Sequence, residues 1–163
     1  MSAYEAYVAA FRDVWSHAWE SVSSVLEGVS EDEARWQAPA YADTEQEAGW
    51  PPEGTILWHI AHLAHCKRYY AAILEHRDEA SPPEVEERTP LGTLAEELAA
   101  LAEAQDAQLA ALVACDGADW SAPAAGKMPL GEFVAMTTRH DAWHGGQIAM
   151  LRRLHRAETG TDA

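Results

Sequence analysis

The segment RHDAWHGGQIAML, residues 139–151, carries two histidines four positions apart, His140 and His144. On a helix, residues at this spacing lie on one face with about 5–6 Å between their side-chain bases, so both imidazoles can reach one metal ion. Apolar positions around them recur every three or four residues, as in an amphipathic helix. The predicted inward row consists of Leu130, Phe133, Thr137, His140, His144, Ile148 and Leu151. Since unpaired polar groups cost a few kcal/mol to bury, a shared metal would satisfy both imidazoles.

The rest of the chain also has helical periodicity. Apolar residues at spacings of three and four predict a continuous helix over 3–27, closed by Gly28. Ser30 and Glu33 resemble a capping box at the start of a short helix that ends near Trp36. Three further long helices are predicted at about 54–77, over the stripe from 94 to 112, and from about Pro129 to 156. Proline and glycine place loops at 37–53, 78–90 and 115–127. The predicted fold is an all-α four-helix bundle with long connecting loops, forming a single domain over 1–163.

Composition restricts the partners. The chain has 27 acidic and 11 basic side chains and a formal charge of −16, a field that repels phosphate. We therefore expect binding neither to nucleic acid nor to anionic membranes. No basic region followed by an apolar run opens the sequence, and no stretch approaches the ~20 apolar residues of a membrane span. Two distant cysteines do not suggest a disulfide framework, so a cytoplasmic location is expected.

A third metal ligand is needed beside His140 and His144, and the predicted helix at 54–77 offers three histidines. On a helical wheel His59 lies deepest in the apolar arc, His62 at its edge and His65 toward the outside. The wheel slightly favours His59 and leaves His62 open. Cys66 follows His62 by one turn, where contact with the site is possible but a small buried hydrophobe is the commoner role. Gly145 and Gly146 favour close helix approach, although room beside a metal is an alternative.

Two motifs together resemble the DinB/YfiT-like family, or DinB superfamily, whose members are thought to be metalloenzymes. They are WHIAHLAHC at residues 58–66 and HDAWHGGQ at residues 140–147. The resemblance extends over nearly the whole chain in helix order and loop placement, although its specific part is short. It implies a four-helix bundle with a metal held by one histidine of the second helix and two of the last. Carried over to this sequence, the implied ligands are His62, His140 and His144.

The resemblance also implies chemistry. Understood members include thiol-dependent S-transferases and an isomerase that works with low-molecular-weight thiols, so a thiol cofactor and a small-molecule substrate are implied. Hydrolysis by a metal-bound water is the rival chemistry. Zinc, nickel and iron all accept imidazole, and the sequence does not choose among them. The alternative function is a non-catalytic metal-binding or stress-response protein, and a homodimer is expected.

Overall fold

The computed structural model describes residues 1–163 except 45–46, 82, 87–88, 91 and 161–163. Its described residues form six α-helices and two short 3-10 helices, with no β-strand. The α-helices are α1 (Ala3–Ser16), α2 (Val22–Leu26), α3 (Glu31–Arg35), α4 (Ile56–Glu75), α5 (Leu94–Val113) and α6 (Leu130–Thr159). The 3-10 helices are η1 (Pro39–Tyr41) and η2 (Ala124–Gly126). The predicted all-α class is therefore confirmed.

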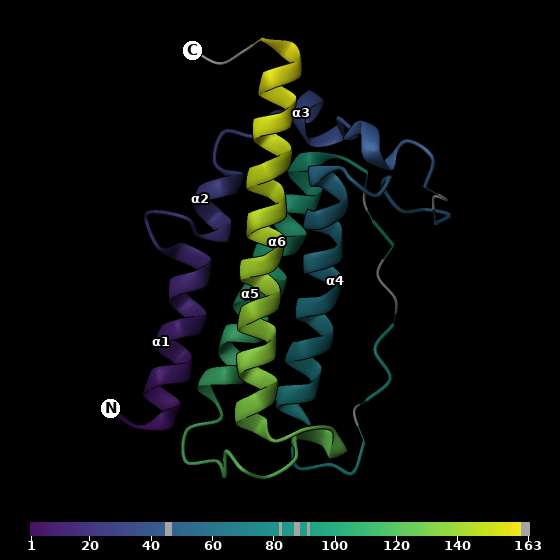
Figure 1. The fold of residues 1–163 in the computed structure, drawn as a ribbon. Coiled ribbons are helices and arrows are strands. Elements are labelled where there is room, and N and C mark those ends of the chain that lie inside the picture. Colours follow the sequence, from purple (N-terminus) through teal and green to yellow (C-terminus); the bar gives the residue numbers. More distant parts are fainter. Residues whose placement is uncertain (45–46, 82, 87–88, 91, 161–163) are drawn as a thin grey trace.

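The four longest helices run lengthwise beside one another, and α6 extends beyond the others at the C-terminal end (Figure 1). Helix α4 packs most extensively against α5, while α6 contacts α1, α2 and α4. The described parts of the connection from α4 to α5, residues 76–81, 83–86, 89–90 and 92–93, lie on one side of the molecule (Figure 1). No helix in the described part of the chain combines the length and apolar character needed to cross a membrane.

The predicted continuous helix over 3–27 is wrong, because the chain leaves the helix after Ser16 and starts α2 at Val22. Ser21 caps α2: its hydroxyl accepts a hydrogen bond from the Ser24 amide at 3.2 Å, and the Ser24 hydroxyl accepts from the Ser21 amide at 2.9 Å. Just before this cap, Glu20 has a φ of +61°. Reciprocal capping satisfies the first amides of a new helix. Here a new helix starts at Val22 although the spacing of apolar residues continues unchanged from α1 into α2.

Only half of the predicted capping box at Ser30 forms. The Ser30 hydroxyl accepts from the Glu33 amide at 3.1 Å, but the Glu33 carboxylate accepts from Arg152 of α6 at 2.9 Å. Arg152 also donates to the carbonyl oxygens of Val25 and Glu27, both at 2.9 Å. One side chain thus fixes α2, α3 and the connection between them to α6.

The core has two apolar parts, one at each end of the long helices. One gathers around Phe11, Leu74 and Phe133, and the other around Ile60 and Ile148. On α6 the histidines at 140 and 144 lie between these parts, so the polar site occupies the middle of the packed helices.

Candidate metal centre

Helix α4 supplies one wall of the site, and its start is fixed by local chemistry. The Thr55 hydroxyl accepts from the Trp58 amide at 3.0 Å and caps the helix. From this start, His59 is buried with 7% of its surface exposed, while His62 and His65 are partly buried. His65 packs edge-on against Trp50, with ring centroids 5.9 Å apart. The helical wheel correctly predicts that His59 is the most deeply buried of the three histidines. His65 instead contacts Trp50, which lies in a loop.

Helix α6 supplies the other wall. His144 is almost fully buried, with 1% exposed, and His140 is half-buried. The ring centroids of His140 and His144 lie 4.4 Å apart, and that of His62 lies 5.4 Å from the first and 4.9 Å from the second. The three histidines implied as ligands by the family resemblance therefore have neighbouring rings.

The two nitrogens of His144 face two different imidazoles. Its Nδ1 lies 2.8 Å from His59 Nδ1, and its Nε2 lies 3.1 Å from His140 Nε2. A neutral imidazole has one donor and one acceptor nitrogen, so His144 donates to one neighbour and accepts from the other. His59 is thereby a hydrogen-bond partner of His144, a position from which it can fix that ring's orientation.

Cys66 faces the site as well. Its sulfur lies 3.4 Å from His62 Nε2, one helical turn away. Among the described residues, the group whose ligand atoms all lie within 4.8 Å of one another consists of His62, Cys66 and His140. Such a group could hold a metal ion. Sequence reasoning gave a packing role more weight for Cys66, although its four-residue spacing from His62 was the available signal.

The environment keeps these imidazoles neutral. Burial, followed by neighbouring histidines, lowers the pKa of His59 and His62 to about 4 and that of His144 to about 2. Burial and the charge of Lys67 lower the pKa of His140. Because metals bind the neutral form of imidazole, the site is ready to ligate near pH 7 without losing protons from these rings.

Two further observations concern the fit of a metal. His140 Nδ1 is buried and has no hydrogen-bond partner in the described structure. Burial raises the pKa of the Cys66 thiol to about 11, so the metal-free thiol is neutral. The donor set of imidazole nitrogens and one sulfur is the kind that zinc and other transition metals prefer. The residues present therefore fit such an ion.

A buried ion pair that sequence reasoning missed lies beside the histidines. Lys67 Nζ contacts Asp141 Oδ2 at 2.5 Å, and the two side chains are 0% and 1% exposed. Lys67 also donates to Gln108 of α5 at 3.3 Å, and its ammonium lies 5.0 Å from the ring centroids of Phe11 and Trp15. The pair joins α4 to α6 directly next to Cys66 and His140.

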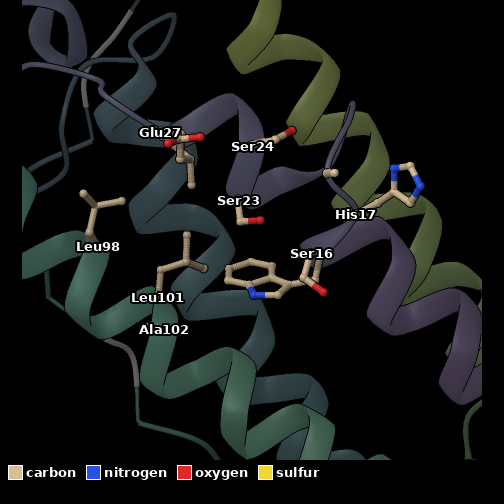
Figure 2. Close-up of a pocket in the computed structure, with 11 residues that line it drawn as sticks. Ser16, His17, Ser23, Ser24, Glu27, Leu98, Leu101 and Ala102 are labelled. Atoms are coloured by element: carbon tan, nitrogen blue, oxygen red, sulfur yellow. The ribbon is translucent and has the colours of Figure 1, made fainter.

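Two cavities are relevant to ligand access. A cavity of about 240 Å³ is lined by Tyr41, Glu53, Gly54, Trp58, His59, Trp143 and Gln147. His59 and Trp58 connect it to the other histidines, because His59 bonds to His144 and the Trp58 ring stacks on His62 with centroids 4.8 Å apart. His62, His140 and His144 themselves do not line the cavity. A larger cavity of about 490 Å³ does not include the histidines of α4 and α6. It is lined by residues that include His17, Ser24, Glu27, Leu98 and Leu101 (Figure 2).

The two glycines after His144 are not required for close helix approach. A Cβ added at Gly145 would lie 3.6 Å from Val22 Cγ2, an ordinary contact, and one added at Gly146 would meet nothing within 4 Å.

Comparison with known proteins supplies the family. The model of a family described as the DinB superfamily matches residues 15–148. No curated protein and no solved structure shows a significant match to the chain.

Proposed function

The chain belongs to the DinB superfamily, and from that premise we propose that it is a metal-dependent enzyme built on a DinB-like four-helix bundle. One divalent ion binds between α4 and α6, and its protein ligands are His62, His140 and His144. The gathering of these three rings, with centroids 4.4–5.4 Å apart, is the observation that carries the proposal.

The contacts around the site support this assignment. His59 holds His144 through its Nδ1 at 2.8 Å, which leaves the Nε2 of His144 on the side of His140. Trp58 stacks on the His62 ring with an interplanar angle of 11° and restricts its rotation. Ligands held in this way lose little freedom when they bind an ion.

A divalent ion held by three imidazoles would supply a Lewis acid with a further coordination position that a substrate or a thiol can take. The protein's own residues do the rest. The cavity beside His59 is the proposed place of a small-molecule substrate, with the Trp58 and Trp143 rings as apolar walls and Gln147 and Glu53 as polar groups. We propose a thiol-dependent S-transferase as the activity, with hydrolysis as the alternative reaction.

A second candidate is a non-catalytic metal-binding dimer. Trp143, Met150 and Leu154 of α6 are 59%, 52% and 45% exposed. Their spacing of seven and four residues places them on one face of the helix. An exposed apolar face of this kind favours association of two copies. The two candidates differ because an enzyme requires a coordination position that a small molecule can reach.

Elemental analysis of tag-free protein tests the metal assignment. We expect about one metal ion per chain in the wild type and in the control His65→Ala. His62→Ala and His144→Ala should lose it, whereas His59→Ala should keep it. Stoichiometric metal in His144→Ala would overturn the three-histidine assignment. A wild type that stays empty after reconstitution would overturn the metal site itself.

Isothermal titration of the cobalt-substituted protein with a small monothiol separates the two functions. About one thiol should bind per ion if the ion has a coordination position that a small molecule can reach. Absence of thiol binding would remove the thiol-transferase and favour the non-catalytic protein.

A further inference from the structure

Cys66 differs from the other cysteine of the chain in what its sulfur faces. Cys115 is fully buried, and its thiol donates to the Ala111 carbonyl oxygen of its own helix region at 3.3 Å. Cys66 is only partly buried, and its sulfur lies 3.4 Å from His62 Nε2. Both thiols are free. The surroundings of Cys115 are those of a packing residue, whereas the Cys66 sulfur contacts the His62 imidazole and also forms a side-chain hydrogen bond with Tyr70.

Two of the separations are close to those of ligands on one ion. With bond lengths of about 2.0–2.1 Å to nitrogen and 2.3 Å to sulfur, tetrahedral coordination puts two nitrogens about 3.3 Å apart and nitrogen and sulfur about 3.5 Å apart. The observed distances are 3.1 Å between the Nε2 atoms of His140 and His144 and 3.4 Å between His62 Nε2 and Cys66 Sγ. The ligand atoms of His62, Cys66 and His140 lie within 4.8 Å of one another, a wider spacing than that of bound ligands, and this group does not include His144. The side chains would therefore move closer together around an ion.

We propose that Cys66 is a fourth, exchangeable protein ligand, whose thiolate occupies the coordination position that an incoming small thiol takes. This inference rests on the proposed metal site. It makes the site closed at rest, with three imidazoles and one thiolate around the ion, and open only when Cys66 leaves.

The exchange balances without an oxidant or reductant. The metal–sulfur bond to Cys66 breaks, and a metal–sulfur bond to the external thiol forms. The proton of the external thiol passes to the Cys66 sulfur, which becomes a neutral thiol. Since one thiolate replaces another, neither the charge on the ion nor its coordination number changes. A site of this kind admits thiols, which ligate soft and borderline metals well, in preference to water.

Cobalt(II) substitution tests the ligand assignment. The wild type without added thiol should show the near-ultraviolet charge-transfer absorption of a thiolate–cobalt bond. Cys66→Ala and Cys66→Ser should lose this absorption while they still bind cobalt, and the matched control Cys115→Ala should keep it. Circular dichroism of each variant establishes that it is folded.

Isothermal titration with 2-mercaptoethanol tests the exchange. Cobalt-loaded Cys66→Ala should bind 2-mercaptoethanol at least tenfold more tightly than the cobalt-loaded wild type, in which the external thiol must displace Cys66, and the control Cys115→Ala should bind it as the wild type does. Zinc-loaded protein should behave in the same way.

The outcomes separate this inference from the function on which it rests. A wild type that binds one cobalt per chain without thiolate absorption would overturn Cys66 ligation and leave the three-histidine site standing. Thiolate absorption that Cys66→Ala retains would do the same. Absorption that depends on Cys66, combined with a wild type that binds no 2-mercaptoethanol or binds it as tightly as Cys66→Ala does, would overturn the exchange. Failure to bind cobalt at all would overturn both proposals.

Discussion

Replacing Lys67 by methionine removes the positive charge that Asp141 faces inside the protein. The two groups meet at 2.5 Å with 0% and 1% of their side chains exposed. Burial lowers the pKa of Lys67 and raises that of Asp141, and the charge of each partner opposes the shift of the other. Methionine keeps much of the aliphatic length that packs near Phe11 and Trp15. The substitution therefore tests the charge more than the packing.

The expected cost follows from what remains behind. Removing one partner of a buried ion pair costs about 3–5 kcal/mol, because the other charge stays buried without compensation. Asp141 Oδ1 already has no hydrogen-bond partner in the described structure, so the variant leaves both carboxylate oxygens unpaired. Replacing both residues, Lys67→Met with Asp141→Leu, removes the stranded charge and should recover most of the loss.

Urea unfolding followed by far-ultraviolet circular dichroism measures these changes. With an m-value of about 2 kcal/mol per M, a loss of about 4 kcal/mol lowers the unfolding midpoint by about 2 M. The exposed neighbour Arg68 provides the control, and Arg68→Met should change stability by less than about 0.5 kcal/mol. A loss below about 1 kcal/mol in Lys67→Met, or a double variant that loses as much as the two single variants together, would refute the reasoning.

Three other substitutions or conditions give sharp expectations. Gly146→Ala should stabilise α6 by about 1 kcal/mol, since the position is helical and open, and a lower thermal midpoint would contradict this. Arg152→Met should cost about 2–3 kcal/mol through the loss of three charge-assisted hydrogen bonds, whereas the exposed Arg153→Met should cost little in the same urea titration. Burial lowers the pKa of His59 and His62 from the ordinary 6.5 to about 4. At pH values under about 6.5, the unfolded chain therefore binds protons that the folded, metal-free protein does not bind. Its free energy of unfolding should therefore fall steadily from pH 6.5 toward pH 4, and a flat profile over this window would show that the imidazoles are not buried as neutral groups.

The long helices were predictable because their patterns are long and uninterrupted. Helices α4, α5 and α6 begin and end within a few residues of the predicted positions. The break after Ser16 was not predictable from periodicity, because Val22 and Val25 continue the apolar spacing of α1. The helix breaks because the Ser21 side chain caps α2 with hydrogen bonds. Such side-chain hydrogen bonds compete with a continuous helix, and the spacing of apolar residues does not reveal them.

The site was predictable in outline because two histidines four residues apart point to one face of a helix. Its neighbours Lys67 and Asp141 were missed. In the apolar stripe of α4, Leu63 and Tyr70 are seven residues apart, and Lys67 occupies the buried position between them. A lysine in such a row requires a buried carboxylate, but which one depends on the rotation of another helix, and a single sequence does not contain that information.

The arrangement of the ion pair and the candidate metal centre is the same on both helices. On α4, Cys66 contacts the histidine cluster, and the next residue, Lys67, forms the ion pair. On α6, His140 belongs to the histidine cluster, and the next residue, Asp141, is the other member of the ion pair. Adjacent residues on a helix are about 100° apart, so fixing Lys67 against Asp141 also fixes the rotation of each helix at the candidate ligands. The apolar double variant should therefore recover stability and still bind metal less tightly, as measured by competition with a chelator. Wild-type affinity in that variant would show that packing alone sets the register of α4 against α6.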